Sequence, residues 1–244
     1  MIWNEERYKK AEAHTKLMEE RYASEIQKSV SQTKTYTGAV EGIELPRHMT
    51  SILFTNTDTV SAAFLYNSGR TAILNFASFT SPGGGFIRGA MAQEEALCHE
   101  SFLYNVLREK EEYYEENKKE LNFYLFSDRA LYSKDVLFFK DNASLPFDVI
   151  TCAAPNYGKA KEFVTYKENN NALRRRIAFI RQIAEANKVE TIILGAYGCG
   201  VFQQEPGVVA AFMKSEFSVS SIKNVIFAVP GQNKNFETFW KVFG

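Results

Sequence analysis

The stretch GGGFIRGAMAQEE, Gly83–Glu95, is the part of the sequence around which the rest of the chain is organised. Three consecutive glycines and a fourth at Gly89 permit positive φ angles and let the backbone approach a ligand closely, because no Cβ atoms intervene. Directly behind them, Glu94 and Glu95 stand at or near the first turn of a predicted helix, where backbone N–H groups are unpaired. The stretch therefore predicts a glycine-rich cradle for a phosphorylated sugar that runs directly into two carboxylates.

The composition of the 244 residues is that of a soluble globular protein. Hydrophobic residues make up 45% and charged residues 24% of the chain, which fits one domain with a single large core. Lysine plus arginine and aspartate plus glutamate number 29 each, so the overall field does not favour general nucleic-acid binding. The sequence shows neither a signal-peptide pattern nor 18 consecutive apolar residues, and we expect a cytoplasmic protein without membrane contact.

The cysteines and histidines give no sign of a metal site. Cys98, Cys152 and Cys199 are widely spaced and form no CxxC pair, which favours free thiols in an intracellular protein. The three histidines are scattered as well, and no spacing of Cys, His or carboxylate residues resembles that of a zinc site. We expect neither a metal nor a cofactor.

The order of the predicted elements is that of an α/β protein. Residues 4–32 are rich in Glu, Lys and Ala and lack Gly and Pro, which predicts a helix on the outside of the domain. Apolar runs at residues 51–55 and 72–77 predict buried strands, and Thr57 or Asp58 can cap a helix between them. A strand, helix, strand unit favours a sheet with parallel pairing. The first glycine loop follows the second strand, at the sheet edge where α/β proteins bind ligands.

The rest of the chain alternates in the same way. Apolar residues three to four apart predict one helix from Leu97 to Leu107, which continues into a solvated, charged end at residues 108–120. The arginines at 174–176 point in different directions on a helix, and we expect them on a solvent face. Further strands are predicted at residues 123–126, 136–139, 148–153, 191–194 and 225–229, and further helices at 166–186, from Pro206 onward and around 236–242.

A second glycine-rich loop, GAYGCGVF at residues 195–202, lies between a predicted strand and the helix that Pro206 opens. Strand, glycine loop and helix in this order offer backbone N–H groups to an anion. The spacing excludes a P-loop, a dinucleotide fingerprint and a G-x-S-x-G nucleophile elbow. What remains is a site for an anion of pyrophosphate size, held between the two loops beside Glu94 and Glu95.

The pattern GGG, seven residues, QEE, formed by residues 83–85 and 93–95, resembles the signature of poly(ADP-ribose) glycohydrolases. Similar to the microbial-type branch of that family are LNFA at 74–77, ITCAAPN at 150–156 and LGAYGCGVF at 194–202. The resemblance covers nearly the whole chain and implies a three-layer, macrodomain-like α/β fold, with a mixed central sheet flanked by helices and an extra N-terminal helix. We expect a single domain over residues 1–244, on which residues 1–45 pack as a helical extension.

The same resemblance implies roles for individual residues. Glu95 would be the catalytic acid, the loop at 195–202 would hold the diphosphate of ADP-ribose, and Phe202 would help to orient the terminal ribose. The residues expected to bind the substrate are Asn75, Gly83, Gly84, Gly85, Gln93, Gly195, Ala196, Tyr197, Gly198, Cys199, Gly200, Val201 and Phe202. Two positions depart from the family pattern: Ser78 stands where Asn is common, and residues 203–206 replace a Gly-Asn-Asp-Pro run.

The chemistry of the reaction suits the two acids. Hydrolysis of a ribose–ribose glycosidic bond passes through an oxocarbenium-like state and needs a proton on the leaving hydroxyl. A glutamate that a bound ligand desolvates can hold that proton at neutral pH, so we assign Glu95 as general acid and, afterwards, as base for the attacking water. Adjacent helical residues point about 100° apart. We therefore expect Glu94 to fix the sugar by accepting hydrogen bonds from the ribose hydroxyls. We expect Gln93 to support the loop or the acids.

The leading hypothesis is a glycohydrolase that releases ADP-ribose from the free end of poly(ADP-ribose). One alternative is a hydrolase of mono-ADP-ribosyl groups on protein or nucleic acid. Another is a module that binds ADP-ribose without cleaving it, which the intact Glu94 and Glu95 disfavour because binding needs no proton donor. The expected partners are poly(ADP-ribose) or ADP-ribosylated protein, with ADP-ribose as the product ligand.

Overall fold

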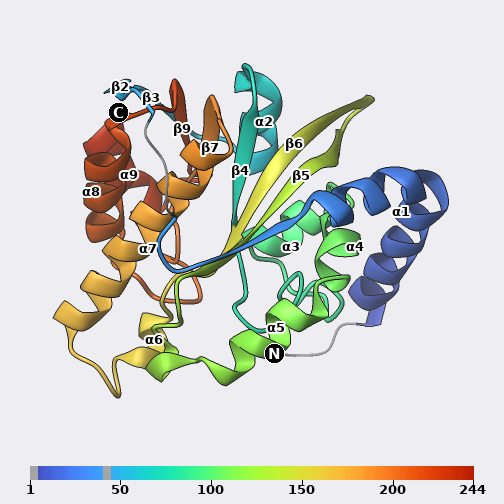
Figure 1. Ribbon diagram of the computed structural model, residues 1–244, viewed down its shortest axis with the longest axis horizontal. Helices are drawn as coiled ribbons and strands as arrows, with labels where there is room; N and C mark the ends of the chain where they lie inside the picture. The colour runs from blue at the N-terminus through green and yellow to red at the C-terminus, as the bar shows by residue number, and fades with distance from the viewer. Residues whose placement is uncertain (1–4, 41–44) are drawn as a thin grey trace.

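The computed structural model describes residues 5–40 and 45–244. Within these residues, seven strands form one mixed sheet in the order β1-β5-β6-β4-β7-β9-β3 (Figure 1). The strands are β1 Lys34–Thr37, β3 Ser51–Thr55, β4 Thr71–Phe76, β5 Arg129–Lys140, β6 Ala143–Cys152, β7 Thr191–Leu194 and β9 Asn224–Ala228. The five strands from β6 to β3 are parallel, whereas β5 and β1 are antiparallel to their neighbours. A separate pair joins β2 His48–Met49 to β8 Val219–Ser220.

Helices cover both faces of the sheet, which gives the expected three-layer arrangement. Figure 1 shows α7, α8 and α9 on one side and α1, α3 and α4 on the other. The helices are α1 Glu5–Gln32, α2 Thr59–Tyr66, α3 Gln93–His99, α4 Leu103–Arg108, α5 Glu111–Lys119, α6 Tyr157–Ala160, α7 Tyr166–Ala186, α8 Pro206–Phe217 and α9 Lys234–Phe243, with a 3₁₀ turn η1 at Asn122–Tyr124. None of these helices has the length and apolar character that crossing a bilayer requires.

Adjacent residues of the central strands pack into different cores. In β4, Leu74 belongs to the core under α7 and α8, whereas Ile73 belongs to the core under α1 to α5. In β7, Ile192 and Ile193 divide in the same way, because successive side chains of a strand point to opposite faces. The central strands are thus buried on both faces, as parallel strands usually are. Their carboxyl ends meet at one edge of the sheet.

Most predicted elements are present. The predicted strands at residues 51–55 and 191–194 coincide with β3 and β7. Strand β7 is buried as predicted, but the prediction that 51–55 is buried was wrong, because β3 lies at the edge of the sheet and is only partly buried. Asp58 caps α2 as expected, since its side chain accepts a hydrogen bond from the N–H of Ser61 at 2.8 Å. The predicted N-terminal helix is α1; the part of the expected extension at residues 1–4 and 41–44 lies outside the described residues.

Two predictions about local structure were wrong. The segment at 123–126 is not a strand but a tight turn in which most residues have left-handed φ angles. The predicted helix from Leu97 to Leu107 is two helices, because the chain breaks at Ser101. That residue forms a β-bridge with Phe138, and its Oγ accepts a hydrogen bond from the N–H of Leu103 at 3.0 Å, which starts α4 in a new direction.

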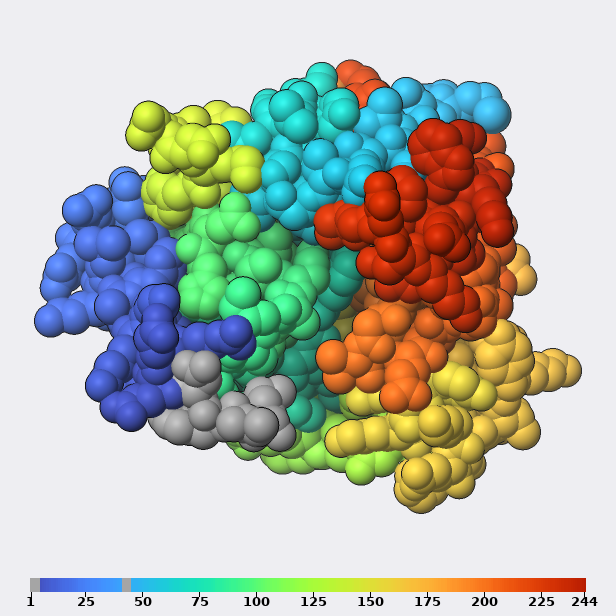
Figure 2. Space-filling view, turned by 180° about the vertical axis from the view of Figure 1, so that it is seen from behind, coloured from blue at the N-terminus to red at the C-terminus, as the bar shows by residue number. Residues whose placement is uncertain are grey.

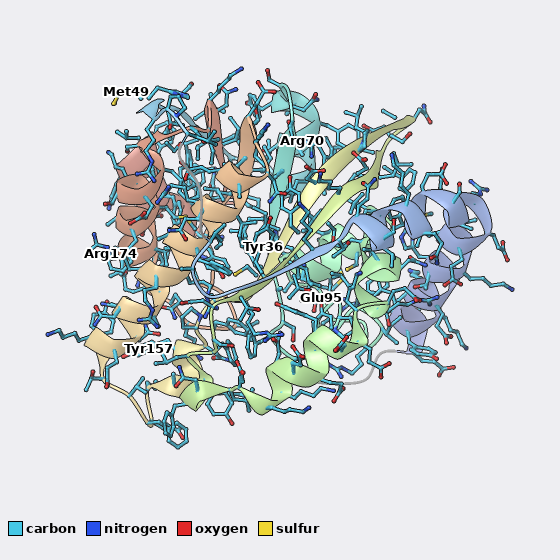
Figure 3. The ribbon with its side chains drawn as sticks, viewed as in Figure 1. Tyr36, Met49, Arg70, Glu95, Tyr157 and Arg174 are labelled. Atoms are coloured by element: carbon cyan, nitrogen blue, oxygen red, sulfur yellow. The ribbon has the colours of Figure 1, made fainter. Side chains whose placement is uncertain are left out.

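Two charged stretches are less solvated than predicted. Helix α5 buries Tyr113 and Tyr114 instead of forming a solvated end. On α7, Arg174 is exposed and projects outward (Figure 3), but Arg176 is completely buried. The Nε of Arg176 donates to Asp128 Oδ1 at 2.7 Å, and its terminal nitrogens donate to two backbone carbonyls. Arg176 therefore holds together the segment that precedes β5 and the segment that follows β6.

Candidate active site

The site is built where the start of α3 meets the end of β4. The side chain of Gln93 bonds to β4 as a neighbouring strand would, accepting from Phe76 N–H at 2.8 Å and donating to Leu74 O at 2.9 Å. Strand β7 pairs with β4 only as far as Ile73, so Gln93 satisfies backbone groups beyond the end of that pairing. Gln93 thereby fixes the first turn of α3, and with it the two glutamates, to the sheet.

Glu95 is held by two backbone N–H groups. Its Oε1 accepts from Gly85 N–H at 2.7 Å and its Oε2 from Ala92 N–H at 2.9 Å. The second bond is the one that a glutamate at the third helical position makes to the N-cap residue. Glu95 thus caps α3 and at the same time ties the glycine loop to that helix. Its side chain is 95% buried, and it lines the cleft described below.

Glu94 faces the sheet. Its Oε2 accepts from Ser78 N–H at 2.7 Å and its Oε1 from Asn75 Nδ2 at 3.1 Å. Burial raises the pKa of Glu94 to about 8; the charge of Glu95 adds to this effect, while the donors at Ser78 and Asn75 oppose it. At neutral pH, Glu94 is therefore mostly protonated.

Asn75 can serve both forms of Glu94. In the present orientation of the Asn75 amide, Nδ2 donates to Glu94 Oε1, as the ionised form of Glu94 requires. Oδ1 of Asn75 is buried and has no hydrogen-bond partner among the described residues. Rotating the amide by half a turn would let Oδ1 accept the proton of a neutral Glu94. The other neighbour of Nδ2 is the hydroxyl of Thr151 at 3.3 Å, which can donate as well as accept. Asn75 lies behind the acids and lines neither part of the cleft.

Gly84 is the point at which the two acids converge. Its φ is +61°, and a Cβ built there would lie 2.7 Å from Glu95 Oε1 and 2.8 Å from Glu94 Oε2. Only a residue without a side chain fits between these two oxygens. Of the other two glycines in this run, both are buried, but Gly85 lines the cleft and Gly83 does not.

A cleft with two adjoining lobes crosses the carboxyl ends of β4, β7 and β9. The acid lobe, about 740 Å³, contains Glu94, Glu95 and the first glycine loop. The loop lobe, about 460 Å³, lies between residues 195–202 and the start of α2. Both lobes are lined by Phe76, Met91, Ala92, Val201 and Phe202. Figure 2 shows this face, with the orange atoms near residue 200 opposite the green and teal atoms of residues 80–105.

The second glycine loop forms one wall of the loop lobe. The predicted residues of this loop that line it are Ala196, Tyr197, Gly198, Gly200, Val201 and Phe202. Gly195 and Cys199 do not line it: a Cβ at Gly195 would lie 2.6 Å from the carbonyl oxygen of Ala228, so this glycine permits close backbone packing. The buried hydroxyl of Tyr197 donates to Cys152 O at 3.1 Å, which anchors the loop to the end of β6.

The two departures from the family pattern have simple structural consequences. Ser78 contacts Glu94 through its backbone N–H, so this contact does not depend on the side chain at that position. Gln204 is buried; its Nε2 donates to Pro155 O at 2.7 Å, and its Oε1 accepts from Asn169 at 2.9 Å. Gln204 therefore fixes the end of the second glycine loop against α7.

Sequence reasoning missed several residues of the cleft. Asp58 and Asn233, which cap α2 and α9, line the loop lobe. Arg88 and Lys159 line the acid lobe. The capping signal at Asp58 located the residue in the sequence, but no local signal shows that two helix starts face the same cleft. Across residues 5–40 and 45–244, no three His, Cys, Asp or Glu side chains are arranged to hold a metal ion.

Comparisons with known proteins give one consistent result. The family model described as "Microbial-type PARG, catalytic domain" matches residues 2–141. A poly(ADP-ribose) glycohydrolase from Thermomonospora curvata, bound to the inhibitor ADP-HPD, is 28% identical, with a TM-score of 0.84 over 98% of this chain and 99% of that chain. A poly(ADP-ribose) glycohydrolase from Deinococcus radiodurans, in complex with ADP-ribose, is 28% identical, with a TM-score of 0.77 over 88% of this chain and 96% of that chain. No curated protein sequence matches the chain.

Proposed function

The chain belongs to the microbial-type poly(ADP-ribose) glycohydrolase (PARG) family, and we propose that it hydrolyses poly(ADP-ribose) with Glu95 as general acid and base. The observation that carries the role of Glu95 is the convergence of its carboxylate and that of Glu94 on Gly84, inside a cleft walled by a second glycine loop. The solved relative from Deinococcus binds ADP-ribose, and we propose that ADP-ribose is the ligand of this cleft as well.

In this proposal, the terminal ADP-ribose unit of the polymer spans both lobes. Its adenosine and diphosphate lie in the loop lobe, where the second glycine loop offers backbone to an anion. Its distal ribose lies in the acid lobe, beside Glu94 and Glu95. Phe202 lines both lobes and is half-buried, so its ring stands where the ribose passes from one lobe to the other.

The proton steps follow from the placement of Glu95. In this proposal, bound substrate desolvates Glu95, which favours its protonated form. As the glycosidic bond breaks, Glu95 gives this proton to the 2′-oxygen of the leaving adenosine, and positive charge develops at C1″ of the distal ribose. The N–H groups of Gly85 and Ala92 stabilise the carboxylate that forms. That carboxylate then takes a proton from the water that attacks C1″. Glu94, mostly protonated at neutral pH, fixes the sugar hydroxyls without adding a second full negative charge.

The N-terminal helix supports this arrangement, and we include it in a single catalytic domain over residues 1–244. On α1, Arg7 Nη1 donates to Gly89 O at 3.3 Å, which ties the helix to the first glycine loop. Further along α1, His14 Nε2 is 2.8 Å from Ser101 O. Helix α1 therefore packs directly behind the loop that carries the site.

The test is release of ADP-ribose from poly(ADP-ribose) by the wild type, by Glu95→Gln and by Glu120→Gln, an exposed matched control. General acid–base catalysis is typically worth about 10² to 10⁴ in rate. We expect Glu95→Gln to lose that factor while its calorimetric affinity for ADP-ribose is kept, and Glu120→Gln to match the wild type. Activity of Glu95→Gln within tenfold of wild type would remove Glu95 from the role of acid.

The same assay tests the free-end mode of cleavage. A long polymer cut only from its end yields ADP-ribose from the first time point, whereas internal cleavage yields oligomers first. Early oligomers would overturn the free-end mode. Binding of ADP-ribose by a wild-type protein that releases none would instead favour a non-catalytic reader or a different linkage.

A further inference from the structure

An exposed aromatic surface adjoins the acid lobe. We define it as the aromatic platform, formed by Phe123, Tyr124 and Phe163. Phe123 and Phe163 are 64% and 58% exposed, and the centre of the Phe163 ring is 6.1 Å from the centres of both the Phe123 and Tyr124 rings. Tyr124 also lines the acid lobe. The platform therefore begins inside the cleft and continues onto the outer surface.

The backbone under the platform is strained. Phe123, Tyr124 and Phe126 have φ angles of 51°, 65° and 61°, a region in which bulky residues are outliers. Tertiary hydrogen bonds hold the turn: Asn156 N–H donates to Tyr124 O at 2.9 Å, and Arg176 Nη2 donates to Phe126 O at 3.2 Å. Strain of this kind persists where the surrounding structure enforces it, typically at functional sites. Here the strained turn leaves the Phe123 ring exposed to solvent and places Tyr124 at the wall of the acid lobe.

Two cations, Lys159 and Arg88, line the acid lobe. Lys159, on α6, places its Nζ 5.1 Å from the centre of the Tyr124 ring. Figure 1 shows α6 beside the segment that follows α5, which carries Tyr124. Arg88, in the first glycine loop, is exposed and donates to Gly84 O at 3.3 Å. Both cations line the acid lobe, and the carboxyl oxygens of Glu94 and Glu95 are bonded to other donors among residues 5–40 and 45–244.

We propose that the aromatic platform and Lys159 form a subsite for the second ADP-ribose unit, the one on the leaving side of the scissile bond. Its adenine stacks on Phe123 and Phe163, and its diphosphate lies near Lys159. Stacking on aromatic rings beside a positive charge is the general way in which proteins hold single nucleotides without reading their sequence. The inference rests on the proposed function, because that function defines which side of the bond leaves.

The chemistry of the polymer places an adenine at this position. The leaving group is the 2′-hydroxyl of an adenosine, so the adenine of the second unit is one sugar away from Glu95. The terminal unit places its adenosine and diphosphate in the loop lobe and only its distal ribose in the acid lobe, so it leaves the platform unoccupied. An amino-acid side chain that carries a single ADP-ribose offers neither a base nor a diphosphate here. The platform therefore selects the polymer over mono-ADP-ribosylated protein.

The test compares two probes, ADP-ribose and the two-unit fragment ADP-ribosyl-ADP-ribose, by calorimetry on the Glu95→Gln protein. We expect the fragment to bind more tightly than ADP-ribose. Adding Phe163→Ala, or Phe123→Ala with Phe163→Ala, should weaken fragment binding by about 5- to 150-fold, the range that one stacked base gives. Affinity for ADP-ribose should not change. Phe163→Ala lies outside the strained turn and keeps the test valid if Phe123→Ala disturbs folding.

Matched controls separate the subsite from general surface effects. Lys159→Ala should weaken fragment binding and reduce its salt dependence, whereas Lys161→Ala, an exposed lysine that does not line the cleft, should do neither. Trp240→Ala removes an aromatic residue that is 55% exposed on α9 and should also leave binding unchanged. Equal affinity for both probes before any platform substitution, or fragment binding that survives the double substitution, would overturn the proposal.

Failure of the subsite and failure of the proposed function give different results. Fragment binding does not require cleavage, so it can be measured even if the wild type releases no ADP-ribose. If the enzyme is active and the subsite is real, the platform variants should raise KM for the polymer and leave kcat unchanged, because stacking contributes equally before and during bond cleavage. An unchanged KM in an active enzyme would reject the subsite alone.

Discussion

Replacing Gly84 with alanine should inactivate the enzyme without unfolding it. The new Cβ would lie 2.7 Å from Glu95 Oε1 and 2.8 Å from Glu94 Oε2, so the nearer oxygen must retreat by about 0.7 Å to reach an ordinary contact of 3.4 Å. Displacements near 1 Å in a catalytic group cost about 10² in rate. The left-handed φ of +61° adds about 1 kcal/mol of strain to the folded state. That strain lowers the Tm by only about 2–4 °C in a chain of this size.

Gly38→Ala is the matched control, because it imposes the strain without the clash. Gly38 has a φ of +69°, but a Cβ there meets no atom within 4 Å. Both variants should therefore lose similar thermal stability, measured by circular dichroism. Only Gly84→Ala should lose about 10² or more in the rate of ADP-ribose release. If Gly84→Ala keeps activity within threefold of wild type, or Gly38→Ala loses as much, the convergence of the acids on Gly84 does not govern catalysis.

Three further predictions follow from buried polar groups. Burial raises the pKa of Glu94 in the folded protein to about 8, from its ordinary 4.5, so the folded protein keeps a proton that the unfolded chain releases. The free energy of unfolding should therefore fall by about 5 kcal/mol as pH rises from about 4.5 to about 8. Glu94→Gln should remove that part of the pH dependence of urea unfolding, and an unchanged slope would contradict it. Arg176→Met leaves Asp128 and two carbonyls without their donor and should lower the free energy of unfolding by about 3 kcal/mol. The control Arg174→Met changes an exposed residue and should stay within about 0.5 kcal/mol of wild type. Equal urea midpoints of the two variants would refute this difference. Gln93→Ala leaves two backbone groups of β4 unpaired and should lower the free energy of unfolding by about 1–3 kcal/mol. It should also slow ADP-ribose release at least tenfold, because the start of α3 is no longer fixed. Full activity would show that β4 does not position the acids.

The sequence predicts those parts of the fold that depend on local signals. Strands β3 and β7 are short apolar runs bounded by polar residues or glycine, and such runs predict strands. Their burial depends on their place in the sheet, since β7 is central and buried whereas β3 is at the edge and only partly buried. Asp58 caps α2 through an N–H three residues away, which is also a local relation. The glycine runs and the acid pair are local as well, so both loops and both acids could be located before the structure.

The wrong predictions concern residues whose partners are distant in the sequence. Arg176 is buried because Asp128, 48 positions earlier, and two loop carbonyls surround its guanidinium. No pattern within α7 distinguishes it from the exposed Arg174. The turn at 123–126 has the aromatic composition of a strand, but Asn156 and Arg176 bind its carbonyls and enforce left-handed angles. Tertiary contacts overrule local preference at both places, and both lie beside the cleft.

The spacing between the glycines and the acids has a physical cause that does not require a ligand. Gly85 N–H donates to Glu95, and the missing side chain at Gly84 makes room for both carboxylates. The intervening residues form successive hydrogen-bonded turns that return the chain to the glycines. At the end of these turns, Ala92 N–H donates to Oε2, the second oxygen of Glu95. One residue more or fewer in the loop would displace Gly85 from Glu95 and break the bond between them, whereas the bond from Ala92 N–H lies within the start of α3 and would be kept. The glycine loop is therefore a binding site for the Glu95 carboxylate, in addition to the role that we propose for it toward the substrate.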